Sequence, residues 1–136
     1  MTTGWDWAGE ALPHVRYLKL DDREARALTG EEDLERAARR LADMGVAEVV
    51  LTHSGGVLVL AEGRIFRAPF RPKSLAGRTG RGDTCFSSYL ARRLLGDTPA
   101  AATRFAAALT TLKLARPGPF RGSLEEVARL ATALDD

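Results

Sequence analysis

The chain has 136 residues, of which 45% are hydrophobic and 28% charged, and this near-average composition excludes disordered, collagen-like and low-complexity proteins. Its 20 basic and 18 acidic residues leave a net charge of +2, which is too balanced for a typical nucleic-acid binder. One cysteine excludes an internal disulfide, and the sequence shows neither a signal peptide nor an apolar run of ~20 residues. We therefore expect one soluble cytoplasmic domain without a membrane or nucleic-acid partner.

The first half of the chain predicts alternating helices and strands. A short helix or arm at residues 1–14 precedes an alternating segment, 15–20, that is typical of a strand. Two helices follow, at 21–30 and 34–45, and each ends at a glycine. The short apolar run 48–52 is a strand of the kind that parallel sheets bury.

The second half predicts a hairpin and then helices. Two short runs within 57–69 flank an expected turn and form the hairpin. Helices are expected at 86–94 and 98–115, and a capping box at Ser123 starts the last one. This order predicts an α/β layer with a mainly parallel sheet, in which residues 15–136 form a single domain.

The glycine-rich segment 77–84 carries the strongest chemical signal. Its glycines allow consecutive backbone N–H groups to converge on an anion, and the helix that follows adds its positive dipole end. Asp83 suits a general base that takes a proton from a hydroxyl beside a bound phosphoryl group. The alternative is that Asp83 only caps the helix. We interpret its neighbour Cys85 as a small buried hydrophobic residue and not as a nucleophile.

A basic stretch runs from Arg64 to Arg81 and contains six lysine or arginine residues. It is either a solvated face or an anion and phosphate site. A nucleic-acid-associated domain is a further hypothesis, and it depends on this stretch alone.

Four segments in order resemble the ribokinase-like, or PfkB-type, carbohydrate kinases. Residues 80–84, Gly-Arg-Gly-Asp-Thr, resemble the Gly-Ala-Gly-Asp-Thr signature of that family. Residues 21–30 resemble its Asn-x-x-Glu segment, which also continues into Leu-Thr-Gly. Residues 51–56 are similar to its Val-Thr-x-Gly-x-x-Gly nucleotide loop, and residues 104–119 to its adenine-side helix and loop. The resemblance covers nearly the whole chain after residue 14.

This resemblance implies a ribokinase-like, Rossmann-like α/β fold, in which helices cover both faces of a sheet that includes one β-hairpin. It also implies ATP-dependent phosphoryl transfer to a hydroxyl of a sugar or sugar-like molecule. Asp83 would be the catalytic base, and the backbone amides of Gly80, Arg81 and Gly82 would form the anion hole. Arg81 stands where the family has a small residue.

The resemblance further implies two cations. Glu24, with Asp21 beside it, would hold Mg²⁺ through water, which suits a cation that keeps its hydration shell. The alternative is that these two carboxylates are only an N-cap and its capping-box partner. A monovalent cation would bind near the glycine-rich loop, where Gly77 and Arg78 replace the usual Asp and Thr.

The implied nucleotide site has a phosphate or ribose side and an adenine side. Its expected residues are Thr52, His53, Ser54 and Gly56 on the first side, and Ala107 and Gly118 on the second. His53 has an alternative interpretation as a plain turn residue. Ala107 lacks the polar side chain that the family often places near adenine.

The segment before Val15 does not resemble the N-terminal half of that family, which carries a β-lid and most of the sugar contacts. We therefore expect the C-terminal, ATP-side half alone, completed by a separate N-terminal half or by a homo-oligomer partner. The alternative is a non-catalytic nucleotide-binding or interaction module that has no acceptor site.

Overall fold

The computed structural model describes residues 8–71, 81–114 and 123–133. Its centre is a four-stranded sheet with the order β1-β2-β3-β4. The strands are β1 (Tyr17–Asp21), β2 (Glu48–His53), β3 (Gly56–Ala61) and β4 (Arg64–Pro69). The predicted hairpin is confirmed as β3 and β4, and both residues of its turn, Glu62 and Gly63, have positive φ values of 54° and 76°.

The expectation of a mainly parallel sheet is wrong for the described strands. Only β1 and β2 are parallel, whereas β2 pairs with β3, and β3 with β4, in antiparallel register. The cause is the length of the connections. Two residues join β2 to β3 and two more join β3 to β4, and such short turns can only connect antiparallel strands.

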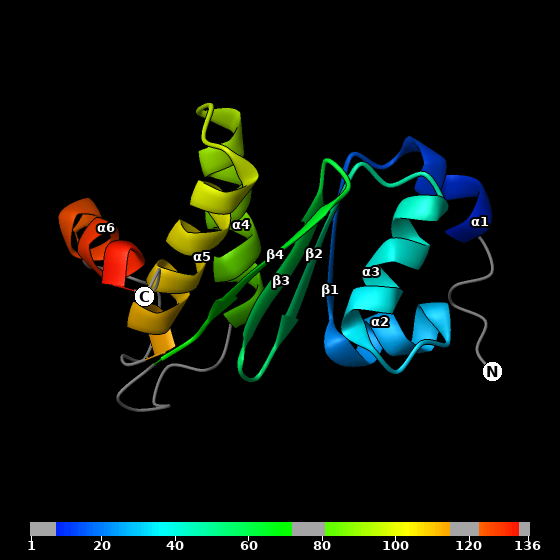
Figure 1. Cartoon of the computed structure of the whole chain (residues 1–136), viewed down its shortest axis with the longest axis horizontal. Coiled ribbons are helices and arrows are strands. Elements are labelled where there is room, and N and C mark those ends of the chain that lie inside the picture. Colours follow the sequence, from blue (N-terminus) through cyan, green and yellow to red (C-terminus); the bar gives the residue numbers. More distant parts are fainter. Residues whose placement is uncertain (1–7, 72–80, 115–122, 134–136) are drawn as a thin grey trace.

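Helices cover both faces of the sheet, which confirms the predicted α/β class. Figure 1 shows the sheet between two helical layers, with α6 packed beyond α5. One layer is formed by α2 (Asp22–Thr29) and α3 (Leu34–Asp43). The other contains α4 (Arg81–Leu94), α5 (Pro99–Leu114) and α6 (Leu124–Ala133). Within the described parts of the chain, no helix combines the length and the apolar character that crossing a membrane requires.

Most helix boundaries follow from local capping signals. The Asp21 carboxylate accepts a hydrogen bond from the amide of Glu24, and α2 ends at Gly30 with φ 75°. At α5 and α6 the hydroxyls of Thr98 and Ser123 accept hydrogen bonds from amides three residues later, as predicted. Because each signal lies within four residues of its helix end, the sequence was enough to find these boundaries.

The start of α4 was predicted at residue 86, and this boundary is wrong, because the helix begins at Arg81. A glycine inside a helix costs about 1 kcal/mol relative to alanine, so Gly82 indicated a loop. The predicted anion loop therefore overlaps with the observed helix α4, and Gly82 and Asp83 belong to the first helical turn.

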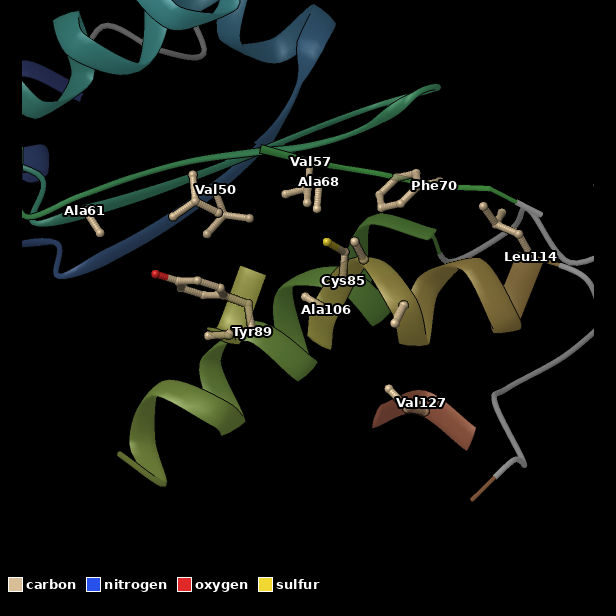
Figure 2. Close-up of a cluster of buried hydrophobic side chains, with 14 residues drawn as sticks. Val50, Val57, Ala61, Ala68, Phe70, Cys85, Tyr89, Ala106, Leu114 and Val127 are labelled. Atoms are coloured by element: carbon tan, nitrogen blue, oxygen red, sulfur yellow. The ribbon is translucent and has the colours of Figure 1, made fainter. Parts of the chain in front are cut away.

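The core between the sheet and α4, α5 and α6 is formed by small and branched side chains (Figure 2). Val50 and Phe70 project from the sheet side, while Cys85 and Tyr89 approach from α4. Both α4 residues are fully buried. The packing of these two side chains determines which face of α4 contacts the sheet. It therefore also determines how the first turn of the helix is oriented.

The N-terminal arm is helical where it is described, with α1 at Ala8–Ala11 and a 3-10 turn, η2, at Leu12–His14. Leu12 is buried with the side chains beneath α3. A Cβ atom on Gly45 would lie 2.6 Å from the Cα atom of Pro13, so the arm packs closely after the end of α3. Residues 1–7 lie outside the described part of the chain.

Candidate functional site

Three elements meet at the carboxyl end of the parallel strand pair. Asp21 at the end of β1 is in register with Thr52 near the end of β2. The first turn of α4 lies over this point, because a Cβ atom on Gly82 would be 2.5 Å from Lys19 Nζ and 3.6 Å from Thr52 Oγ1. Ligands of open α/β sheets bind outside the carboxyl ends of the strands, and this arrangement is of that kind.

The close approach shows what a side chain at position 82 would change. Any side chain there would displace the Lys19 ammonium from the start of α4. The first amides of a helix have no partner within the helix, and its dipole adds positive potential at the same end. Lys19 therefore contributes a full positive charge to a place that already attracts anions.

Asp83 is the third residue of α4 and is exposed. It is inside the helix, so it is not the N-cap residue that the alternative interpretation required. An open surface pocket of about 420 Å³ lies beside it. The described residues that line this pocket are Asp83, Thr84, Ser87, Ser88 and Leu109. A carboxylate that is accessible beside an electropositive helix end can accept a proton from a bound molecule.

Asp21 and Glu24 form a reciprocal capping box. The amide of Glu24 donates to Asp21 Oδ1 at 2.7 Å, and the amide of Asp21 donates to Glu24 Oε1 at 2.9 Å. The capping alternative is thus confirmed. The second oxygen of each carboxylate makes no hydrogen bond to any described residue.

Those free oxygens suit a hard cation. Among the described residues, no group of three or more His, Cys, Asp or Glu side chains could hold a metal. Two carboxylates nevertheless fit Mg²⁺, which takes one or two protein carboxylates and completes its shell with water and substrate phosphates. The residues present therefore fit a magnesium ion that is bound chiefly by its donor substrate.

The predicted phosphate-side residues lie at the β2–β3 turn. Thr52 is buried, while Ser54 is exposed. His53 Nδ1 accepts a hydrogen bond from the amide of Gly55 at 3.1 Å, which supports the turn interpretation of this histidine. Gly56 has a structural reason, because a Cβ atom there would lie 2.4 Å from the carbonyl oxygen of Ala68 on β4.

The adenine-side expectation does not fit Ala107. This residue is fully buried in the core between α5 and the sheet, so no part of it is accessible to a ligand. Gly118, Gly80, Gly77 and Arg78 lie outside the described residues.

Cys85 is buried, as predicted, and burial raises the pKa of its thiol to about 12 in spite of opposing effects of Thr110 and Lys19. At neutral pH it is protonated and is not a nucleophile.

Lys19 is the residue that the sequence interpretation missed. It stands between Leu18 and Leu20 on β1, two residues before Asp21. A lysine between two leucines of a strand was the available signal, because charged residues are uncommon among apolar ones in a strand that packs against a core.

The sequence is similar to known proteins over most of its length. Residues 6–127 match the family described as pfkB family carbohydrate kinase. A cytidine kinase of Thermococcus kodakarensis is 34% identical over 89 residues, which are 63% of this chain and 32% of that protein.

Two solved structures extend the likeness to the fold. A pyrophosphate-dependent kinase in the ribokinase family, complexed with a pyrophosphate analogue and myo-inositol, is 38% identical with a TM-score of 0.83, covering 92% of this chain and 45% of that one. A putative ribokinase II from E. coli, in complex with ATP and Mg²⁺, is 24% identical with a TM-score of 0.80. The match covers 94% of this chain and 42% of that one. The chain thus spans less than half the length of each of these relatives. Because the family match extends over most of its length, the chain belongs to the pfkB family of carbohydrate kinases.

Proposed function

We propose that this chain supplies the donor-binding part of an enzyme that transfers a phosphoryl group from ATP to a hydroxyl of a sugar or sugar-like small molecule. The observation that carries the proposal is the convergence of Lys19 and the first turn of α4, with an accessible Asp83 in that turn. A cation and free amides bind phosphate, and a carboxylate beside them accepts the proton of an attacking hydroxyl.

The proposed reaction uses Asp83 as the base. The acceptor oxygen forms a bond to the terminal phosphorus of ATP while the bond from that phosphorus to the leaving ADP oxygen breaks. The proton of the acceptor hydroxyl passes to the Asp83 carboxylate. The amides of Gly80, Arg81 and Gly82 stabilise the charge on the transferring group, since donors that are already oriented need no reorganisation during the reaction.

Lys19 and the β2–β3 turn bind the donor in this proposal. The Lys19 ammonium pairs with phosphate oxygens as a compact charge. Thr52, His53 and Ser54 contact the phosphates or the ribose of the donor, and Gly118 contacts its adenine. Ala107 is not retained, because it is buried.

Asp21 and Glu24 would hold Mg²⁺ through their free oxygens or through its water ligands. When bound, the ion would neutralise charge on the donor phosphates. A monovalent cation near the glycine-rich loop remains an expectation from the family resemblance.

Pyrophosphate is a second candidate donor. The solved pyrophosphate-dependent kinases are 37–38% identical to this chain, whereas the ATP-bound ribokinases compared with it are 23–24% identical and share the fold. The phosphate-binding groups, Lys19 and the start of α4, suit either donor because both present a terminal phosphoanhydride.

The acceptor site is proposed to come from elsewhere, either from an N-terminal half or from a second chain. The matched structures are more than twice as long as the part that this chain covers. Among the described strands, β1 has a neighbour on one side only, so its other edge is open to a further strand. Without such a partner, the chain would be a non-catalytic nucleotide-binding module.

Calorimetric titration of the folded chain with Mg·ATP and with Mg·pyrophosphate tests donor binding directly. We expect saturable binding of at least one donor, and binding of neither would contradict the proposal. Transfer to a panel of sugars and polyols, measured after the chain is joined to the N-terminal half of a relative, tests the reaction. Donor binding without transfer in any folded fusion would favour the non-catalytic alternative.

A further inference from the structure

An ion pair between a buried glutamate and a half-buried arginine joins β2 to α4 at the amino end of β2. Glu48, the first residue of β2, is 5% exposed. Its Oε1 atom accepts a hydrogen bond from the Tyr89 hydroxyl at 2.5 Å and another from Arg93 Nε at 3.1 Å. Its Oε2 atom accepts one from Arg93 Nη2 at 2.8 Å. Glu48, Tyr89 and Arg93 are called the Glu48 cluster below.

The Glu48 cluster is charged at neutral pH. Burial by itself raises the pKa of Glu48, but the hydrogen bonds from Arg93 and Tyr89 outweigh it, so the pKa lies below its ordinary value of 4.5. The hydrogen bond to Glu48 raises the pKa of Arg93 in turn. Arg16 adds a weaker favourable charge, and Arg93 also donates to the carbonyl of Asp97 at 2.8 Å. Both carboxylate oxygens of Glu48 therefore accept hydrogen bonds.

The two elements that this cluster joins also carry the candidate site, and they run in opposite directions. β2 begins at Glu48 and leads towards Thr52, whereas α4 leads from its first turn, which contains Gly82, towards Arg93. Tyr89 also belongs to the buried core, and its ring lies between α4 and the sheet (Figure 2). About 15 Å of helix separates Arg93 from Asp83, at a rise of 1.5 Å per residue.

At the site end, α4 is not bonded to β2 in the same way. There Gly82, which has no side chain, lies close to Thr52: a Cβ atom on it would be 3.6 Å from Thr52 Oγ1. Among the described side chains, no hydrogen bond or ion pair joins Asp83 or Thr84 to Lys19 or Thr52. The side-chain hydrogen bonds described between β2 and α4 are those of the Glu48 cluster.

We propose that the Glu48 cluster is a positioning device for the candidate site. By fixing the tilt and the axial position of α4 against β2, it places the Asp83 carboxylate and the first-turn amides relative to Lys19 and Thr52. This inference rests on the proposed function, in which those groups bind and transfer a phosphoryl group. A displacement of about 1 Å in a reacting group is enough to reduce turnover by as much as 100-fold.

Nuclear magnetic resonance of the full chain tests the coupling without requiring activity. Tyr89→Phe keeps the buried ring and removes one hydrogen bond, and Arg93→Lys keeps the charge but loses the bidentate contact. We expect both variants to shift the backbone amide signals of residues 82–84. The matched control is Arg92→Gln, which removes the adjacent ion pair to Asp97, at 2.8 Å, without touching β2.

The inference would be overturned if the backbone amide signals of residues 82–84 shifted no more in the cluster variants than in the Arg92→Gln control. The comparison uses only variants whose core signals remain dispersed, which shows that they are folded. If Arg93→Lys unfolds, Tyr89→Phe still provides the test, because it removes only one hydroxyl group.

A kinetic measurement on the joined enzyme separates positioning from stability. We expect Tyr89→Phe to lower kcat about tenfold while the KM for the donor changes less than about twofold, since the donor-binding groups themselves are intact. Arg92→Gln should leave both values unchanged. First-turn shifts accompanied by an unchanged kcat would overturn the inference. If the wild-type enzyme transfers nothing, the proposed function fails, whereas the amide shifts still decide whether the cluster positions α4.

Discussion

The two ends of the β2–α4 pair are built in opposite ways. At the amino end of β2, Glu48 is buried and bonded to two residues of α4. At the carboxyl end, the side chains of Lys19, Thr52 and Asp83 make no hydrogen bond or ion pair within the described parts of the chain. The stabilising polar contacts lie at the Glu48 end, where we expect no ligand. At the other end, where we expect the ligand, the polar side chains remain available to bind it. Variants at the two ends should therefore have different effects.

The largest effect is expected at the site end. Asp83→Asn removes the proposed base but keeps the shape of the side chain, and we expect kcat to fall about 1,000-fold with the melting temperature unchanged. The measurement is phosphoryl transfer by the joined enzyme, with Arg92→Gln, near the other end of α4, as the control. Unchanged turnover in Asp83→Asn would remove Asp83 from the mechanism.

The next effect is expected at the opposite end and concerns stability. Glu48→Gln leaves the guanidinium of Arg93, whose side chain is 16% exposed, without its countercharge, and we expect a loss of about 3 kcal/mol in the free energy of unfolding at pH 7. The pKa of Glu48 is lowered on folding, so its contribution is full above about pH 4.5 and is lost as the pH falls through the lower, folded value.

The difference between the wild type and Glu48→Gln should therefore shrink as the solution is acidified. Urea unfolding at several pH values between neutral and acidic measures this difference. A difference that is constant with pH would show that the Glu48 charge does not contribute to stability.

The two ends of the β2–α4 pair also differ in how far the sequence could predict them. The α2 boundaries and the Gly-Arg-Gly-Asp-Thr segment were found because their signals are local in sequence. The pairing of Glu48 with Arg93 was not, since 45 residues separate them and neither has a distinctive neighbour. The role of Lys19 likewise depends on Gly82, which only the folded chain brings beside it.

A smaller effect is expected for Lys19→Gln, which keeps a polar side chain but removes the charge at the start of α4. We expect donor affinity to fall about tenfold, because a hydrogen bond to a charged group contributes about 1.5–3 kcal/mol, and stability to change little. Calorimetry with Mg·ATP and Mg·pyrophosphate measures the change. Arg23→Gln, an exposed neutralisation on α2, is the control, and equal affinities in the two variants would contradict the role of Lys19.

The smallest effect is expected on the sheet surface, away from both ends. Glu35→Gln weakens an ion pair to Arg67 whose N–O distance is 2.9 Å but whose side chains are 39% and 61% exposed. Exposed pairs of this kind contribute about 0–1 kcal/mol, so we expect a loss near 0.5 kcal/mol in urea unfolding. A loss as large as that of Glu48→Gln would show that burial does not distinguish the two carboxylates.

The contact between Gly82 and Lys19 has a consequence for how this chain can change over evolution. A Cβ atom at position 82 would occupy the space of the Lys19 ammonium, so alanine there obliges the end of the lysine side chain to move. Because that side chain is flexible, the chain can accept alanine at position 82 while it keeps lysine at position 19, with the ammonium displaced from the start of α4. The cost of such a substitution therefore falls on the placement of the cation, and so on the proposed donor binding, rather than on folding.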